Sequence, residues 1–173
     1  MNIALFGFMG VGKTVVGKAV ASKTGLVFKD IDELIVKRAQ KPILKIFQED
    51  GEKCFREIER EITKEIASGD KQIIALGGGT ILDENSLKHL KKTSILILLS
   101  ANPGVILSRT ASDGLVRPLL NVEDKIGRIR GLLFERLPKY LAAADYVVDT
   151  SEGSPNEIAK EIIEGLGGFE NCS

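Results

Sequence analysis

The feature that most constrains this chain is an eight-residue run near its start, Gly7-Phe8-Met9-Gly10-Val11-Gly12-Lys13-Thr14. It fits the pattern G-x-x-x-x-G-K-[ST], with the apolar stretch 3–6 before it and helical spacing after it. Glycines let the backbone curl so that its N–H groups face an anion beside a helix N-terminus. A strand-to-helix turn that binds nothing is the alternative. The run predicts a phosphate-binding loop, with Lys13 on the β- and γ-phosphates and Thr14 on magnesium.

The rest of the chain alternates between short apolar runs and segments with helical spacing. The runs are continuously apolar, as in parallel strands covered on both faces by helices. The expected strands cover 3–6, 73–76, 95–99 and 146–148, with a weaker one at 26–28. The expected helices cover 13–23, 31–39, 52–67, 86–91, 104–110, 122–143 and 155–165. This alternation predicts an α/β fold, a three-layer αβα sandwich around a five-stranded parallel sheet.

Length and charge narrow the class of protein. A chain of 173 residues is typical of one domain, which we expect to span 1–173. Basic and acidic residues number 24 each, so net charge gives no reason to expect a nucleic-acid or membrane partner. The longest apolar run, 95–99, is far shorter than the ~20 residues of a membrane helix. With no basic leader at the start, we expect a cytoplasmic protein, and we expect a monomer.

Two carboxylates, Asp30 and Asp32, follow the weak second strand. On an extended segment, a spacing of two points both side chains to the same face. Together they could hold magnesium through its water shell and orient or deprotonate an attacking hydroxyl. The alternative, that one of them caps the helix that follows, is expected for at most one.

Three consecutive glycines, 77–79, follow the buried run 73–76. They allow a ligand to approach the backbone closely, although a flexible turn without a ligand explains them equally well. The segments 31–67 and 111–121 interrupt the strand–helix alternation, and such loops are more often functional than accidental. No N/T-K-x-D guanine-recognition motif occurs. These features favour phosphoryl transfer to a small acceptor.

Several motifs in this order resemble those of the shikimate kinases, from Ile3 to about Glu164. Besides the phosphate-binding loop they are Asp30-Ile31-Asp32, Phe47-x-x-x-Gly51-Glu52-x-x-Phe55-Arg56-x-x-Glu59, Gly77-Gly78-Gly79, Arg117-Pro118-Leu119-Leu120 and Glu135-Arg136-x-Pro138-x-Tyr140. The resemblance implies a fold like that of P-loop nucleoside monophosphate kinases. It also implies ATP-dependent phosphorylation of the shikimate 3-hydroxyl, giving shikimate 3-phosphate on the route to chorismate and aromatic amino acids.

On the acceptor side, the resemblance implies that Asp32 binds the shikimate hydroxyls and acts as, or helps, the general base. Arg56 and Arg136 would clamp the carboxylate, and Gly78 and Gly79 would donate backbone hydrogen bonds. Arginine suits this clamp because guanidinium can bind a planar carboxylate through two parallel hydrogen bonds. Glu59, three residues after Arg56 on one helical face, is interpreted as orienting that arginine. The acceptor-binding segment would span about 31–60.

On the nucleotide side, the resemblance implies that Asp30 holds magnesium through water and that Thr14 ligates it. Arg117, on a lid of about 111–121, would close over the transferring phosphoryl group, and Arg109 and Pro155 would flank the adenine. The loop residues expected to contact ATP are Gly10, Val11, Gly12, Lys13 and Thr14. Val15 departs from the family pattern, which usually has a second hydroxyl residue here, and this puts one α-phosphate contact in doubt.

Two other interpretations stay open. The first is a kinase for gluconate or a nucleoside monophosphate, since gluconate would also need a carboxylate clamp. The second is a regulatory nucleotide-binding protein without catalysis, against which the presence of Lys13, Asp32, Arg56, Arg117 and Arg136 speaks.

Overall fold

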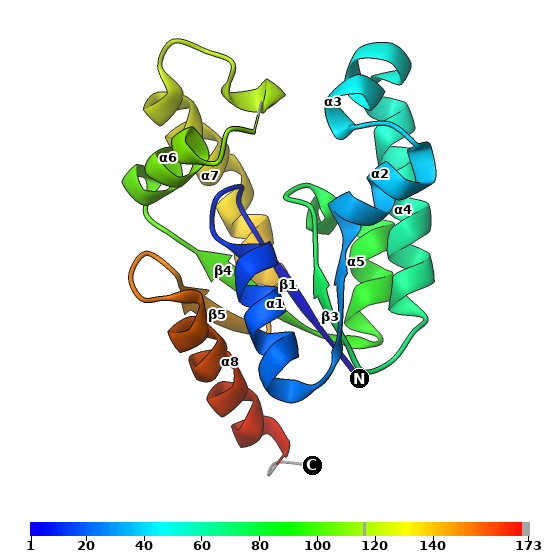
Figure 1. Cartoon of the computed structure of the whole chain (residues 1–173), viewed down its shortest axis with the longest axis vertical. Coiled ribbons are helices and arrows are strands. Elements are labelled where there is room, and N and C mark those ends of the chain that lie inside the picture. Colours follow the sequence, from blue (N-terminus) through cyan, green and yellow to red (C-terminus); the bar gives the residue numbers. More distant parts are fainter. Residues whose placement is uncertain (116, 171–173) are drawn as a thin grey trace.

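The protein folds around a five-stranded sheet whose strands all run parallel (Figure 1). The structure, a computed structural model, describes residues 1–115 and 117–170, so Val116 of the predicted lid lies outside it. The strands, in the spatial order β2-β3-β1-β4-β5, are β1 (Asn2–Gly7), β2 (Val27–Asp30), β3 (Gln72–Ala75), β4 (Ser94–Ser100) and β5 (Tyr146–Asp149). All five predicted strands are present, the weak one included.

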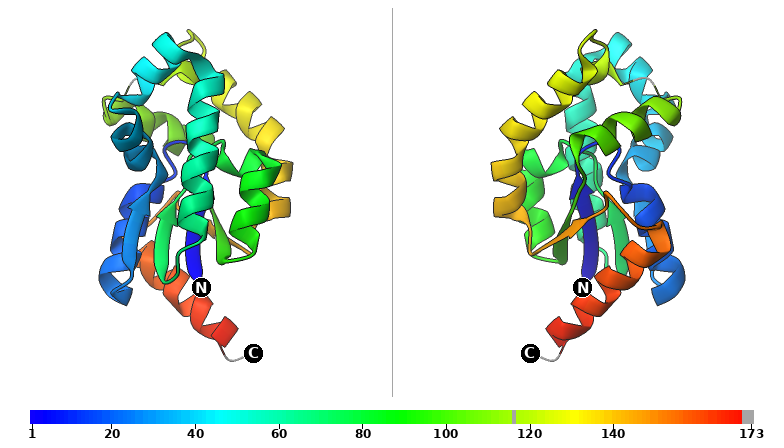
Figure 2. Two further views of the ribbon diagram at one scale, coloured as in Figure 1. Left: turned by 90° about the vertical axis from the view of Figure 1, so that its right-hand side faces the viewer. Right: turned by 90° about the vertical axis from the view of Figure 1, so that its left-hand side faces the viewer.

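Helices cover both faces of the sheet, which confirms the three-layer prediction. Helices α1 and α8 pack together on one face, and α4, α5 and α7 lie on the other (Figure 2). The longer helices are α1 (Lys13–Thr24), α2 (Ile31–Ala39), α4 (Gly51–Ala67), α5 (Glu84–Lys91), α6 (Pro103–Ser112), α7 (Lys125–Ala143) and α8 (Pro155–Glu170). Short turns are α3 (Ile43–Lys45), the π-helical η1 (Ile46–Asp50), and the 3₁₀ turns η2 (Thr80–Leu82) and η3 (Pro118–Leu120).

Helix boundaries differ from the prediction where a side chain caps the first turn. Helix α5 begins two residues early because Asp83 accepts a hydrogen bond from the backbone N–H of Ser86. Helix α7 begins three residues later than predicted because Asp124 accepts from the N–H of Gly127. Within the described residues, no helix combines the length and the apolar character needed to cross a membrane.

The central strand β1 pairs with β3 on one side and β4 on the other. Its apolar residues 3–6 lie in the core, as continuous apolarity predicted. Because parallel strands end at the same sheet edge, the segments after β1, β2 and β3 emerge side by side. These segments are the phosphate-binding loop, the Asp30–Asp32 turn and the three glycines.

At the amino ends of the strands, the buried side-chain amide of Asn2 links β1 to the segment before β3. Asn2 is fully buried, its Nδ2 donates to the carbonyl of Gly69 at 2.9 Å, and its Oδ1 accepts from the N–H of Gln72 at 3.1 Å. These bonds join the start of β1 to the turn that leads into β3. Without these partners the fully buried amide of Asn2 would be unsatisfied, and that is the costly outcome for a buried polar group.

We predict that Asn2→Ala lowers the free energy of unfolding by about 1–3 kcal/mol, because two part-buried hydrogen bonds are lost. Urea denaturation would measure the change. Asn85→Ala, at an exposed position in the first turn of α5, is the control and should change little. Equal stability of the Asn2→Ala variant and the parent would contradict this account of the sheet edge.

Candidate active site

The phosphate-binding loop follows β1 and has the backbone conformation that its glycines allow. Gly10 and Gly12 have φ of 74° and 95°, in the left-handed region that other residues rarely adopt. Lys13, the first residue of α1, donates from Nζ to the carbonyls of Gly7 and Phe8 at 3.2 and 3.0 Å. Its ammonium therefore lies across the loop, where a phosphate bound at the helix N-terminus would meet it.

Asp30 and Thr14 form a pair of oxygen groups beside this loop. Thr14 Oγ1 donates to Asp30 Oδ2 at 2.7 Å, and Asp30 Oδ1 accepts from the N–H of Asp32 at 2.9 Å. Asp30 ends β2 and caps α2, while Asp32 lies in the first turn of α2. The prediction that both stand on one extended segment is wrong, because the cap turns the chain into a helix between them. Capping by one of them was the stated alternative, and Asp30 is that residue.

The carboxyl of Asp32 and the ammonium of Lys13 shift each other's titration. Burial, followed by the charge of Asp30, raises the pKa of Asp32 to about 6, against the opposing charge of Lys13. Burial lowers the pKa of Lys13 to about 8, against the charges of Asp32 and Asp30. Asp32 is nevertheless an exposed residue. Its shift therefore reflects protein packed around the carboxyl rather than complete removal from water.

Arg56 is held by a buried carboxylate. Its Nη1 donates to Glu59 Oε2 at 2.6 Å, and the other oxygen of Glu59 accepts from Thr80 Oγ1 at 2.7 Å. The Glu59 side chain is only 3% exposed. A Cβ at Gly79 would lie too close to Arg56 Nη1, so any other residue there would displace the guanidinium. The contact between Glu59 and Arg56 confirms the sequence interpretation; Thr80 was missed, because no spacing rule connects it to α4.

Arg136, on α7, approaches the same glycines from the other side. A Cβ at Gly78 would lie 3.7 Å from its Nη1, and its guanidinium lies 5.8 Å from the centre of the Phe8 ring. Within residues 1–115 and 117–170, no carboxylate forms an ion pair with Arg136. Two arginines from different helices thus border the Gly78–Gly79 pair, and one of them has its charge available for an anion.

Two phenylalanines line the wall next to Arg56. The rings of Phe47 and Phe55 are 4.7 Å apart, and the Arg56 guanidinium lies 5.1 Å from the Phe55 centroid. Phe55 is buried and packs in the core, whereas Phe47 is partly exposed. This wall gives the arginine an apolar neighbour and leaves an apolar surface beside it.

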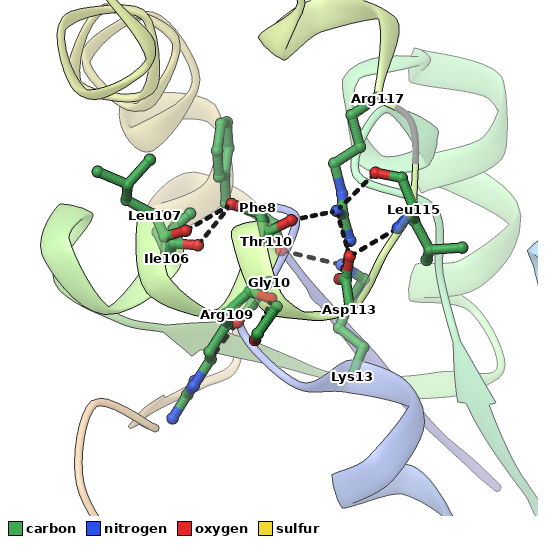
Figure 3. A network of polar contacts seen from close by, with 11 residues as sticks. Phe8, Gly10, Lys13, Ile106, Leu107, Arg109, Thr110, Asp113, Leu115 and Arg117 are labelled. Carbon is green, nitrogen blue, oxygen red and sulfur yellow. Dashed lines mark hydrogen bonds and ion pairs between the residues drawn. The ribbon is translucent and has the colours of Figure 1, made fainter.

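Arg117 stands at the start of the turn η3 and is held by the end of α6 (Figure 3). It forms an ion pair with Asp113, and its Nη1 donates to Asp113 Oδ1 at 2.9 Å and to the Thr110 carbonyl at 3.3 Å. This pairing lowers the pKa of Asp113. The positive charge of Arg117 also reaches Lys13, whose pKa it helps to lower. The partner Asp113 was missed, although an acid four residues before an arginine is a recognisable signal.

A cavity of about 240 Å³ lies against this segment. It is lined by Thr110, Ala111, Leu115, Arg117, Leu120, Asn121 and Lys125. The guanidinium of Arg117 therefore borders open space as well as its own ion pair.

Arg109 ties the phosphate-binding loop to the end of β5. Its Nη1 donates to Thr150 Oγ1 at 3.2 Å and to the Gly10 carbonyl at 3.4 Å. Figure 3 shows Arg109 beside Gly10. The Thr150 hydroxyl in turn donates to the Val11 carbonyl at 2.7 Å. Pro155 is exposed at the start of α8, beyond this contact. The structure thus places Arg109 against the loop, and Thr150 is a loop contact that sequence reasoning missed.

Comparisons with known proteins identify the family. A model described as shikimate kinase matches residues 9–167. The shikimate kinase of Thermodesulfovibrio yellowstonii is 45% identical over 94% of this chain and 93% of its own length. A solved shikimate kinase from Acinetobacter baumannii in complex with shikimate has a TM-score of 0.92 and 34% identity, covering 97% of this chain and 93% of that one.

The chain belongs to the shikimate kinase family. Its fold is accordingly the P-loop nucleoside monophosphate kinase-like one, and it is an ATP-dependent small-molecule kinase. A gluconokinase from Sinorhizobium meliloti also matches, with a TM-score of 0.60 and 17% identity, which shows a shared fold alone. The gluconokinase and this chain share the sandwich fold, so the fold does not distinguish them. The match to the shikimate kinase family does.

We predict that the carboxyl of Asp32 titrates near pH 6 and that Lys13→Met raises its pKa further, because the lysine charge opposes burial and Asp30. Carbon-13 NMR of the aspartate carboxyls would follow both titrations. Lys18→Met, which removes an exposed lysine of the same helix, is the matched control and should leave Asp32 unchanged. A carboxyl that titrates at its ordinary value near 3.9 would contradict the environment described here.

Proposed function

We propose that this chain transfers the γ-phosphoryl group of ATP to the 3-hydroxyl of shikimate, giving shikimate 3-phosphate and ADP on the route to chorismate. The observation that carries the proposal is the pair Arg56 and Arg136 on the two sides of Gly78–Gly79, next to Asp32 and Lys13. This arrangement combines a carboxylate clamp, a base and a phosphate-binding loop. The relative crystallised with shikimate supports the choice of acceptor.

The acceptor would lie between the segment 31–60 and helix α7. Arg56 and Arg136 would bind its carboxylate with charge-assisted, paired hydrogen bonds. The backbone N–H groups of Gly78 and Gly79 are available as donors, since no described residue accepts from them. The wall of Phe47 and Phe55 would cover the apolar face of the ring.

Asp32 is suited to take the hydroxyl proton. With a pKa of about 6, it is mostly ionised at neutral pH and still basic enough to accept a proton. As the acceptor oxygen forms its bond to the γ-phosphorus, the bond from that phosphorus to the β–γ bridging oxygen breaks, and ADP leaves with the electron pair. Lys13, which stays protonated at neutral pH, would stabilise charge on the β- and γ-phosphate oxygens.

Thr14 and Asp30 fit a magnesium ion that arrives with ATP. Their side-chain oxygens lie 2.7 Å apart at the entrance to α1, and both are the hard oxygen donors that Mg²⁺ prefers. Thr14 would ligate the ion directly and Asp30 through water. The described residues contain no cluster of three or more histidine, cysteine, aspartate or glutamate side chains able to hold a metal. The ion would therefore depend on the phosphates for its other ligands, and would neutralise phosphate charge when bound.

The remaining roles concern the nucleotide. Gly10, Val11, Gly12, Lys13 and Thr14 would contact the phosphates, and Arg109 and Pro155 would flank the adenine. Arg117 would face the transferring phosphoryl group as part of a lid at 111–121, exchanging contact with Asp113 for the phosphate. Exclusion of water by this segment would limit hydrolysis of ATP. The whole chain 1–173 would work as one kinase domain, and the monomeric state and cytoplasmic location expected from the sequence stay predictions.

We predict that ADP release by the purified protein with ATP and magnesium is strongly stimulated by shikimate and not by gluconate or AMP. The Asp32→Ala variant should bind ATP but lose almost all turnover, because no carboxylate then receives the hydroxyl proton. A coupled assay for ADP measures the rate, and calorimetry measures ATP binding. Stimulation by gluconate alone would refute the acceptor, and ATP binding without any stimulation would favour a nucleotide-binding protein that has lost catalysis.

Arg136→Ala should weaken acceptor binding while leaving the affinity for ATP in place. Loss of one charge-assisted pair costs about 1.5–3 kcal/mol, which corresponds to a rise of about 10- to 150-fold in the KM for shikimate. Arg130→Ala removes an exposed arginine from the same helix and is the matched control. An unchanged KM for shikimate in the Arg136 variant would remove this residue from the clamp.

A further inference from the structure

Tyr140 is a buried tyrosine of α7 whose hydroxyl reaches the proposed acceptor site. The side chain is 1% exposed, and its ring meets Phe6 of β1 edge-on, with centroids 5.8 Å apart. At the far end of the ring, the hydroxyl donates a hydrogen bond to the carbonyl of Gly78. The ring would pack equally well without this hydroxyl, so the hydrogen bond itself calls for an explanation.

The hydrogen bond to the Gly78 carbonyl also orients the rest of that peptide group. In a trans peptide, such as the one between Gly78 and Gly79, the C=O and the N–H point in opposite directions. A hydroxyl that fixes the Gly78 carbonyl therefore fixes the direction of the Gly79 N–H, which points away from Tyr140. None of the described residues accepts a hydrogen bond from that N–H, so it is left as a donor for a ligand.

Glycine makes this control necessary. Without a Cβ, a Gly–Gly peptide can rotate more freely than any other, so an N–H meant for a ligand needs an outside constraint. Arg56 limits the peptide on the Gly79 side, where its guanidinium fills the space of a Cβ. On the Gly78 side, the matching constraint comes from Tyr140, whose hydroxyl would lie 3.9 Å from a Cβ there.

Burial keeps the hydroxyl protonated, so that it can act as a donor. Burial raises the pKa of Tyr140, and the smaller opposing effects come from the charge of Arg136, a hydrogen bond with Arg136 and the charge of Arg56. Among the titratable groups, these two arginines are therefore the ones that act on it, and both belong to the proposed carboxylate clamp. With the pKa raised, the hydroxyl is protonated throughout the physiological range and can donate to the Gly78 carbonyl.

We propose that Tyr140 is a positioning residue of the acceptor site: its hydroxyl fixes the Gly78–Gly79 peptide so that the Gly79 N–H is aimed at the acceptor. The inference rests on the proposed function, since it assigns that N–H to shikimate. Tyr140 touches neither the nucleotide loop nor the reacting oxygen in this account. It acts through the Gly78 carbonyl, beside the guanidinium of Arg136.

The test is Tyr140→Phe, which removes the hydroxyl and keeps the ring against Phe6. We expect the KM for shikimate to rise about 3- to 10-fold, as suits the loss of one oriented hydrogen bond, with the KM for ATP unchanged. Tyr146→Phe is the matched control, because it removes the other tyrosine hydroxyl of the chain, on β5. Thermal denaturation of all three proteins shows whether the fold has been kept.

A second measurement follows the Gly79 amide directly. In protein labelled with ¹⁵N-glycine, the amide resonance of Gly79 should shift as shikimate is added, and in Tyr140→Phe this shift should shrink. A Gly79 amide that does not respond to shikimate overturns the inference, even if the variant fails to fold.

The outcomes separate this inference from the function beneath it. If the wild-type protein phosphorylates shikimate and Tyr140→Phe has an unchanged KM for shikimate, the role of Tyr140 is refuted and the proposed function is not. Equal increases in the KM values for shikimate and ATP, with a lowered melting temperature, assign Tyr140 to packing and sink it as well. Absence of shikimate-dependent ADP release from the wild-type protein overturns the proposed function, and the role of Tyr140 with it.

Discussion

The parallel pairing of β1 between β3 and β4 is the constraint on which the site depends. Since parallel strands end together, the chain must leave β1, β2 and β3 at one edge, and each exit carries a different chemical group. The exit from β1 supplies backbone donors and Lys13, that from β2 supplies Asp30 and Asp32, and that from β3 supplies the glycines. The phosphate-binding loop, the Asp30–Asp32 turn and the three glycines are thus neighbours because of sheet topology.

Charge balance is the second condition that the site must meet. Lys13 keeps its proton at neutral pH in a crowded place because Asp30 and Asp32 raise its pKa against burial. In turn, the lysine holds the pKa of Asp32 down to about 6, near the value that suits a base at neutral pH. Glu59 pairs with Arg56 beside the glycines. Of the two arginines that border Gly78 and Gly79, Arg56 is paired with Glu59, whereas Arg136 forms no ion pair within the described residues, and its charge is available for an anion.

The sequence predicted the features that depend on local patterns of residues. The loop 7–14, the strands and the glycines 77–79 could be recognised because buried parallel strands are continuously apolar and a phosphate turn needs glycine at fixed positions. Contacts between distant segments could not be recognised. Thr80 with Glu59 and Thr150 with Val11 join residues 21 and 139 positions apart, and no periodicity predicts them. The prediction that Asp30 and Asp32 share one extended segment was wrong for a different reason. A capping aspartate, here Asp30, can end a strand and begin a helix within one residue.

The two neighbouring glycines are constrained in different ways, and this explains why the motif needs more than flexibility. At Gly79 the constraint is steric, because the Arg56 guanidinium takes the place of a side chain. At Gly78 it is a hydrogen bond, because a tyrosine hydroxyl holds the carbonyl. Arg56 comes from α4 and Tyr140 from α7, so the peptide is located relative to two helices that also carry the two clamp arginines. Any movement of one helix would therefore displace one of these arginines and the Gly79 N–H together. Under the proposed roles, this ties recognition of the carboxylate to placement of the hydroxyl.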